Sequence, residues 1–182
     1  MLTNPNREKF KFCPSCGSSS LSPNDCKSFV CSKCKFLFYI NTAAATAGLI
    51  FDNDNRLLIT VRKNDPAKGS YDLPGGFADP SENIEETLTR EIKEELNLDI
   101  FDIKYFDSES NDYLYKDVNY TTLDMVFTCK VKSFEHIKAN DDVEDFLFLN
   151  INELSENDFG LKSIKNVIKQ LKQKITNKQL IL

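Results

Sequence analysis

Three glutamates, Glu91, Glu94 and Glu95, stand close together near the middle of this 182-residue chain. Residues three and four positions apart share one face of a helix, so a helix here would gather the three carboxylates. Like charges at these spacings destabilise an isolated helix by about 0.2–0.5 kcal/mol per pair, and burial adds a desolvation cost. A hard divalent cation requires oxygen ligands and negative charge, so the pattern predicts a metal site.

Two Cys-x-x-Cys pairs near the N-terminus form a second candidate site: Cys13 with Cys16, and Cys31 with Cys34. In a chain whose N-terminus shows no apolar signal region, such pairs indicate a structural zinc site with four thiolate ligands. Disulfides or a redox pair are the alternative. Four thiolates complete a tetrahedral shell, so the zinc is expected to be structural and not catalytic.

The remaining two cysteines are interpreted separately. Cys26 lies between the two pairs and is expected to be free, with substitution for one ligand as the alternative. Cys129 lies in an apolar stretch and is expected to be a small buried hydrophobic residue.

The helix that must position the three glutamates has a clear start signal. Asn83 followed by Glu86 is a capping-box pattern, and the helix is expected to end near Leu96. Glu82, just before it, is expected to interact favourably with the helix dipole, with metal ligation as the alternative. The three acids lie within, beside or just outside an apolar stripe that should face the core. The stripe consists of Ile84, Leu88, Ile92 and Leu96.

The segment from Gly76 to Leu98 resembles the Nudix box of the Nudix (MutT-like) hydrolases. Gly76 is followed after five residues by Glu82, and after seven more by REIKEELNL from Arg90 to Leu98. Every fixed position of the box is matched except one, where Asn97 replaces the usual Gly. Asn also adopts the left-handed conformation that ends many helices, so this departure is mild. The alternative is an acidic surface helix that follows a turn.

The resemblance implies a Nudix α/β/α sandwich with a mixed sheet over residues 41–182, preceded by a zinc ribbon over residues 1–40. It also implies hydrolysis of the diphosphate bond in a nucleoside diphosphate linked to another group, with Mg²⁺ or Mn²⁺ as cofactor. The substrate would be of the dinucleotide, nucleotide sugar or NTP type. A ribbon followed by the box is similar to the NADH pyrophosphatase branch, but that branch's Ser-Gln-Pro-Trp-Pro-Phe-Pro signature is absent.

The resemblance also implies roles for individual residues. The metal ligands would be the carbonyl of Gly75 together with Glu91, Glu94 and Glu95. Glu94 or Glu95 would activate the attacking water. Arg90 would hold one glutamate by a charge-assisted hydrogen bond.

Five residues outside the box are further candidates. Glu144 and Asp145 match the place of a distal acid that many family members use, with solvated loop acids as the alternative. Arg62 would border the substrate site, or be a surface cation at a strand end. Tyr113 and Tyr115 would stack on a base or line the substrate site, or form one face of an edge strand.

Alternating and continuous apolar runs predict the surrounding elements. A closing helix is expected over residues 159–175, a polar Tyr-rich segment over 107–119 and an acidic loop over 141–145. Strands are expected at Ala43–Phe51, Arg56–Arg62, Ile100–Phe106, Tyr120–Val131 and Phe146–Leu149. Within the ribbon, short strands are expected around Phe10–Phe12, Phe29–Val30 and Phe36–Tyr39.

The net charge of −5 is unevenly distributed. Residues 1–40 hold six Lys and Arg against two acids, and residues 160–182 hold six Lys and no acid, which leaves 11 basic residues against 26 acids between them. An acidic middle suits a metal site and disfavours a nucleic-acid groove. The basic ends keep one alternative open, a nucleic-acid-binding or regulatory protein whose Nudix domain senses a nucleotide. The intact glutamates and Arg90 favour an enzyme.

No apolar run reaches the ~18 residues of a membrane span, and no secretory signal is present at the N-terminus. A cytoplasmic protein without a membrane partner is therefore expected. A ribbon that serves as a structural brace or as the surface of a homodimer is compatible with the enzyme hypothesis.

Overall fold

The computed structural model describes residues 3–177, so residues 178–182 of the predicted second domain lie outside it. The chain forms two compact units. The first contains the N-terminal part up to Thr42 together with Asp112–Thr121, and the second contains Ala43–Asn111 and the chain from Thr122 onward. Within the described range, no helix is long and apolar enough to cross a membrane.

The first unit is built on a small antiparallel sheet in the order β1-β2-β3. The strands are β1 (Leu21–Pro23), β2 (Ser28–Cys31) and β3 (Leu37–Tyr39). One face buries Phe29 against Phe10 and Phe38, with ring centroids 5.5 to 6.3 Å apart. The predicted strand around Phe10–Phe12 is wrong, because this segment is irregular and contributes Phe10 to the small core without pairing.

The second unit contains two three-stranded sheets. One has the order β4-β8-β7, in which β4 (Ala43–Ile50) runs parallel to β8 (Val118–Val131), next to β7 (Ile100–Tyr115). The other has the order β6-β5-β9 and is antiparallel, with β6 (Tyr71–Asp72), β5 (Leu57–Arg62) and β9 (Val143–Leu149).

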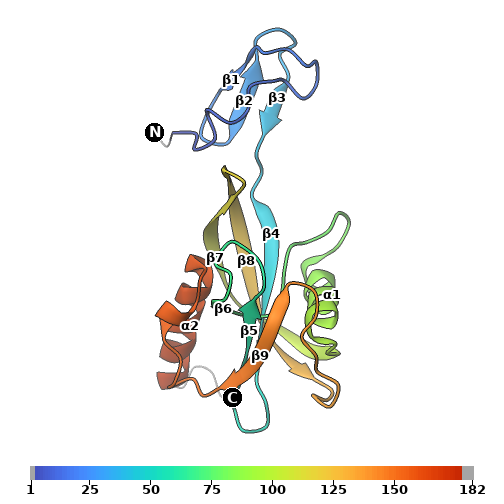
Figure 1. Cartoon of the computed structure of the whole chain (residues 1–182), viewed down its shortest axis with the longest axis vertical. Helices are drawn as coiled ribbons and strands as arrows, with labels where there is room; N and C mark the ends of the chain where they lie inside the picture. Colours follow the sequence, from blue (N-terminus) through green and yellow to red (C-terminus); the bar gives the residue numbers. More distant parts are fainter. Residues whose placement is uncertain (1–2, 178–182) are drawn as a thin grey trace. The chain divides into compact units, whose positions relative to one another are not determined.

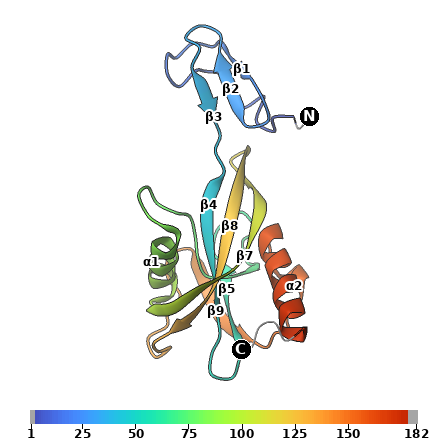
Figure 2. The ribbon, with the colours of Figure 1, turned by 180° about the vertical axis from the view of Figure 1, so that it is seen from behind.

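Two helices cover opposite sides of these strands, as Figures 1 and 2 show. Helix α1 (Ile84–Leu96) packs with Leu58, and helix α2 (Lys162–Thr176) packs with Leu57 and Ile59; a 3₁₀ turn, η1 (Glu156–Asp158), precedes α2. Successive strand residues point to opposite faces, so one strand contributes to both cores. The layering is helix, strands, helix, and the mixed sheet is as predicted.

The β7–β8 hairpin is longer than the sequence indicated. The polar segment over 107–115 is part of β7, and the two strands are joined by Lys116 and Asp117, both with positive φ (45° and 64°). A two-residue turn of this kind matches the twist of a hairpin. The tip of this hairpin, Asp112–Thr121, belongs to the first unit, which the predicted domains did not include.

Candidate active site

Helix α1 presents the glutamates and is capped as the sequence predicts. The Asn83 side chain accepts from the Glu86 N–H, and the Glu86 carboxylate accepts from the Asn83 N–H. Asn97 ends the helix in the left-handed conformation with φ of 54°. The start and the end of α1 are therefore fixed by two asparagines, and burial of Leu88, Ile92 and Leu96 orients the helix on the sheet.

Glu95 is a buried carboxylate held by a backbone amide. Its side chain is 7% exposed, and its Oε2 accepts from the Gly75 N–H at 2.9 Å. Burial raises the pKa of Glu95 well above its ordinary value, although the Gly75 hydrogen bond opposes this, and the charges of Glu91, Asp72 and Asp142 raise it further. An ionised carboxylate in this position is unfavourable unless a cation approaches it.

Arg90 binds three glutamates at once. Its Nε and Nη2 donate to the two oxygens of Glu82 at 2.6 and 2.9 Å, and its Nη1 donates to Glu91 at 2.9 Å and to Glu94 at 3.0 Å. Its Nη2 also donates to the Phe77 carbonyl. The Arg90 hydrogen bonds lower the pKa of Glu82 to about 2. Arg90 therefore joins the loop before α1 to the acidic face of the helix.

One arginine does not balance the acids around it. Arg90 carries one positive charge, whereas Glu82, Glu91, Glu94 and Glu95 can carry four negative charges. Burial raises the pKa of Glu91, and the charge of Glu94 adds to this effect against the opposing Arg90 contacts. Oxygen donors with excess negative charge are the chemistry that Mg²⁺ or Mn²⁺ requires, so the residues present fit a divalent cation.

Gly75 and Gly76 let the backbone pass between α1 and β4. Gly75 has φ of +142°, and a Cβ there would lie 2.3 Å from the Thr46 carbonyl oxygen. A Cβ at Gly76 would lie 2.5 Å from the Glu91 carboxyl carbon. The segment is held by hydrogen bonds of 2.8 Å from the Thr46 N–H to the Gly76 carbonyl and from the Gly48 N–H to the Pro74 carbonyl. Only glycine fits at Gly75, where the neighbour is backbone, whereas a side chain at Gly76 would displace the end of Glu91.

The predicted distal acids, Glu144 and Asp145, are exposed residues of β9. The Asp145 side chain accepts a hydrogen bond from the Phe146 N–H. The acids that the structure brings toward the glutamates are Asp141 and Asp142, whose charges raise the pKa of Glu91 and Glu95 respectively. They precede β9 at the start of the acidic segment over 141–145, which was predicted as a loop and whose last three residues belong to β9.

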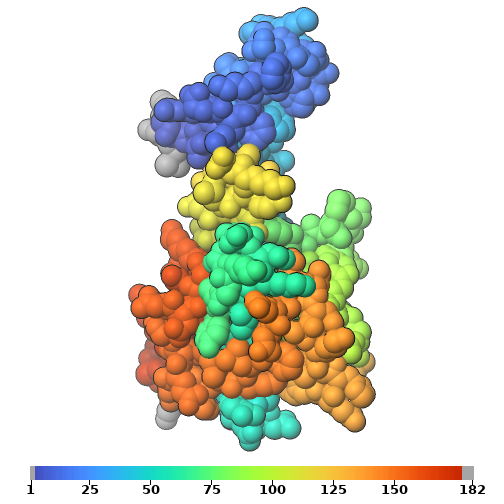
Figure 3. All heavy atoms as spheres, viewed as in Figure 1, coloured from blue at the N-terminus to red at the C-terminus, as the bar shows by residue number. Residues whose placement is uncertain are grey.

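The loop that carries Asp141 and Asp142 packs between α1 and the end of β5. The Asn140 N–H donates to the Glu95 carbonyl, and the Asn64 side chain donates to Asp142 at 2.7 Å. Figure 3 shows the segment after β5, in green at the centre, beside this part of the chain, in orange. The role of a distal acid stays a prediction for Glu144 and Asp145.

The other candidate substrate contacts lie in different surroundings. Arg62 ends β5 and forms an ion pair with the buried Asp72, a residue that the sequence analysis did not consider. Tyr113 and Tyr115 lie in the hairpin tip of the first unit, whereas the glutamates lie in the second. Contact of these three residues with substrate stays a prediction.

The four cysteines of the two Cys-x-x-Cys pairs converge. Their sulfurs all lie within 4.8 Å of one another, with Cys13 and Cys34 at 3.7 Å and Cys16 and Cys31 at 3.8 Å. A tetrahedral zinc site with Zn–S bonds of about 2.3 Å has sulfurs about 3.8 Å apart, so the cluster fits zinc. Cys26 is exposed, and Cys129 is buried as expected.

Across residues 3–177 these cysteines are the one group of His, Cys, Asp and Glu side chains whose ligand atoms converge this closely. Glu91 and Glu94 are instead both bonded to Arg90 Nη1, and Glu95 is bonded to the Gly75 amide. A cation bound between them would therefore need partial release of the Arg90 contacts.

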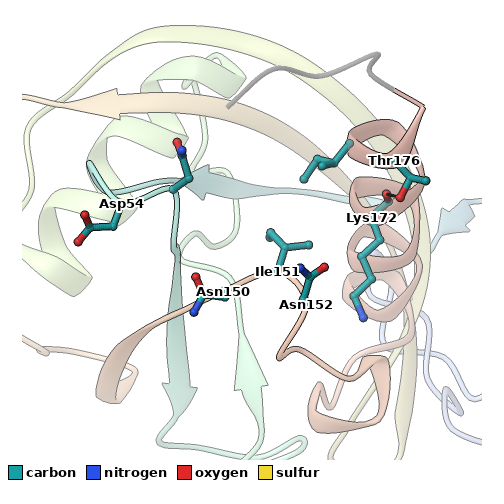
Figure 4. Close-up of a pocket in the computed structure, with 8 residues that line it drawn as sticks. Asp54, Asn150, Ile151, Asn152, Lys172 and Thr176 are labelled. Carbon is teal, nitrogen blue, oxygen red and sulfur yellow. Dashed lines mark hydrogen bonds between the residues drawn. The ribbon is translucent and has the colours of Figure 1, made fainter.

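A separate cavity of about 420 Å³ lies near the end of α2. Figure 4 shows Lys172 extending from α2 beside the segment that carries Asn150, Ile151 and Asn152. None of the residues that line this cavity belongs to the glutamate-bearing segment.

Known proteins resemble this chain in sequence. The family model described as NUDIX domain matches residues 41–171. An ADP-ribose pyrophosphatase of Methanocaldococcus jannaschii is 36% identical over 132 residues, which cover 71% of this chain and 75% of that protein. An NAD-capped RNA hydrolase NudC of Pseudomonas fluorescens is 24% identical over 144 residues, 79% of this chain and 49% of that protein. The chain thus spans about half the length of this second relative.

Solved structures resemble it in fold. A NUDIX hydrolase from Nitrosomonas europaea has a TM-score of 0.69 and 20% identity, and the match covers 91% of this chain and 92% of that one. A bifunctional NMN adenylyltransferase/ADP ribose pyrophosphatase from Francisella tularensis has a TM-score of 0.56 and 22% identity over 75% of this chain and 42% of that one. These likenesses confirm the predicted fold class.

Proposed function

The chain belongs to the Nudix family, and from this premise we propose that it is a divalent-metal-dependent hydrolase of ADP-ribose, NAD and related nucleotides. The proposed reaction cleaves the diphosphate bond that joins the two halves of the substrate. The observation that carries the proposal is the buried Glu95, held by the Gly75 amide beside Glu91 and Glu94. The substrate class is suggested by the relatives, one named for ADP-ribose and others for NAD caps.

The proposed cation, Mg²⁺ or Mn²⁺, would be held by Glu91, Glu94, Glu95 and the Gly75 carbonyl. When bound, it neutralises the charge that develops on phosphoryl oxygens as water attacks phosphorus. The protein's own part is to hold the acids in place. Arg90 fixes Glu91 and Glu94 in the structure described here, and the Gly75 amide fixes Glu95. These contacts hold the acids near their proposed positions, and partial release of the Arg90 contacts would let a cation bind between them.

Proton transfer from the attacking water is assigned to Glu94 or Glu95. Glu95 is the buried member of the pair and has the raised pKa, which burial causes. Glu94 is about half exposed and bonded to Arg90. Glu95 is the stronger candidate because burial and the Gly75 amide hold its carboxylate in one position, whereas the Glu94 carboxylate is occupied by Arg90.

For the four cysteines we propose structural zinc. The sulfur separations fit a tetrahedral site, and a unit whose sheet has three short strands cannot bury enough surface to be stable alone. Four thiolates leave no open position, so this zinc would take no part in the hydrolysis.

The test is a substrate panel with product identification. Purified protein with Mg²⁺ is expected to release AMP from ADP-ribose and NAD, and Glu95→Gln is expected to lower kcat at least ~100-fold. Glu85→Gln is the matched control, because Glu85 is an exposed acid on the first turn of the same helix. If no member of the panel yields a mononucleotide, or if both variants behave alike, the proposal is wrong.

Nucleic-acid binding is the second candidate, and one observation favours it. Leu37 and Tyr39, on the outer face of β3, are 43% and 45% exposed, close in sequence to Lys33 and Lys35. Aromatic rings and cations bind single strands by stacking and charge. Retention of single-stranded RNA at low salt that is lost in Lys33→Gln/Lys35→Gln supports this candidate, and equal elution of both proteins rejects it.

A further inference from the structure

Asp72, the last residue of β6, is a buried carboxylate with two partners. It is 7% exposed. Its Oδ2 accepts from Arg62 Nη1 at 2.5 Å, and its Oδ1 accepts from the Leu73 N–H at 2.9 Å. A buried carboxylate of this kind depends on its cation, because removal of one partner leaves an uncompensated charge in the interior.

Arg62 holds the adjoining loop as well as Asp72. Its Nε donates to the Pro66 carbonyl at 2.8 Å. Its backbone N–H donates to the Ser70 carbonyl, and its own carbonyl accepts from the Gly69 N–H. The guanidinium therefore bonds two groups of the protein itself, the Asp72 carboxylate and the Pro66 carbonyl. The loop over residues 63–70 leaves from Arg62 and returns to hydrogen-bond with its backbone.

The Asp72 side chain fixes the chain just before the glycines of the site. The residues that follow it are Leu73, Pro74, Gly75 and Gly76. The Pro74 and Gly76 carbonyls are bonded to β4, and the Gly75 amide lies between them and donates to Glu95. A shift at Asp72 would pass along this short, hydrogen-bonded segment to the amide that holds Glu95.

We propose that Arg62 and Asp72 are a positioning pair, which sets the place of Gly75 and Gly76 against Glu95 and Glu91. This replaces substrate contact as the role of Arg62 and rests on the proposed hydrolysis. A displacement of about 1 Å near reacting groups lowers the rate about 100-fold, whereas loss of a substrate contact of equal strength in the ground and transition states raises KM.

The test compares Arg62→Met with Arg56→Met. Arg56 forms a similar ion pair with Asp52 in the turn between β4 and β5, away from the glycines. Arg62→Met is expected to lower kcat for ADP-ribose 10- to 100-fold with KM changed less than threefold, and Arg62→Lys is expected to recover part of the loss. Arg56→Met is expected to change neither constant. A tenfold rise in KM at unchanged kcat would overturn the proposal.

A second measurement does not depend on activity. Hydrogen exchange of the Gly75 amide, which donates to Glu95, is expected to speed up at least tenfold in Arg62→Met and to be unchanged in Arg56→Met. If the wild type hydrolyses none of the panel, the proposed function fails but this measurement still decides the pair. Unchanged Gly75 exchange overturns the pair even if the enzyme is active.

If Arg62→Met does not fold, Arg62→Met/Asp72→Asn takes its place, because this double variant removes both charges together. The same faster exchange at Gly75 is expected in it. If Gly75 keeps its wild-type protection in the double variant, the pair does not position the glycine segment.

Discussion

Asn6 and Asn119 exchange two hydrogen bonds of 2.7 Å across 113 residues of sequence. The Asn6 side chain donates to the Asn119 carbonyl and accepts from the Asn119 N–H. Asn6 is 3% exposed, so water does not compete for these bonds. The pair fixes the hairpin tip within the first unit.

Asn6→Ala is expected to free the hairpin tip from the N-terminal segment. It leaves the Asn119 N–H and carbonyl without these partners, at a cost of about 1–3 kcal/mol. Faster hydrogen exchange of the Asn119 amide is the measurement. Lys9→Gln is the control, because the Lys9–Asp117 pair at the same tip is exposed and worth about 0–1 kcal/mol. Equal Asn119 protection in Asn6→Ala and wild type would contradict the expectation.

Gly76→Ala is expected to lower activity, and Gly75→Ala is expected to lower stability. At Gly76 the new Cβ meets the end of the Glu91 side chain, which can move, so activity should fall at least about tenfold with little change in Tm. At Gly75 it meets the backbone of Thr46, so stability should fall. Thermal melts and kcat for both variants check this. A Tm loss in Gly76→Ala as large as that in Gly75→Ala would contradict it.

The raised pKa of Glu95 predicts how stability changes with pH in magnesium-free buffer. Burial makes the folded protein hold the Glu95 proton more tightly than the unfolded chain does, so stability is full below the ordinary value of 4.5 and is lost as pH rises through the higher folded pKa. The loss is at most about 1.4 kcal/mol per pH unit.

Glu95→Gln should remove this loss. The variant should therefore match the wild type near pH 4.5 and exceed it at pH 8, as judged by urea unfolding at both pH values. Addition of Mg²⁺ should raise the stability of the wild type at pH 8 more than that of the variant. If the wild type is as stable as Glu95→Gln at pH 8 without metal, the ionised Glu95 carboxylate does not destabilise the folded protein, and the expectation is wrong.

Thiol labelling distinguishes bound zinc from disulfides. With zinc bound, one thiol, Cys26, should react with iodoacetamide at neutral pH, because burial raises the pKa of Cys129 to about 12 and zinc protects the other four. After a chelator removes zinc the first unit should lose its structure, so all four cysteines of the two pairs should react as well. Intact mass spectrometry counts the labels. Disulfides would leave the number at one after chelation, and Cys26→Ser should reduce the zinc-bound count to none.

The acidic loop before β9 offers a direct test of the distal acid. Asp142→Asn is expected to lower kcat about 10-fold or more, whereas Glu144→Gln and Asp145→Asn, which alter exposed side chains on the strand, should change it less than threefold. Steady-state kinetics of the three variants with ADP-ribose provides the comparison. A larger loss of kcat in Glu144→Gln or Asp145→Asn than in Asp142→Asn would instead support the distal acid that the sequence predicted.

Local signals in the sequence located the helix of the site but not its partners. The caps of α1 are short-range patterns, so Asn83 and Asn97 could be placed from their neighbours alone. Arg90 was assigned to a glutamate, and the structure adds Glu82 and the Phe77 carbonyl to its partners. These additions depend on how the loop before α1 folds back, which spacing does not encode.

Long-range pairs were missed for the same reason. Nothing near Asp72 in sequence indicates Arg62 as its partner, since residues 63–70 between the two strands form an irregular loop. The sequence predicts a polar, Tyr-rich segment over 107–119, with one face of an edge strand as the alternative for Tyr113 and Tyr115, and residues 107–115 are strand in the structure. They extend as a strand because β8 pairs with them and the tip packs in the first unit.

The hairpin tip belongs to the first unit, whereas the rest of β7 and β8 belongs to the second. The polypeptide therefore passes between the two units three times, after residues 42, 111 and 121. A single proteolytic nick near residue 42 should therefore not release the N-terminal fragment, since Asn6 still holds Asn119 on the other fragment. A chimera with a single fusion junction cannot transfer the whole cysteine-bearing unit to another protein, because the unit is made of two separate segments of the chain. A working chimera must carry the hairpin tip along with the first 42 residues.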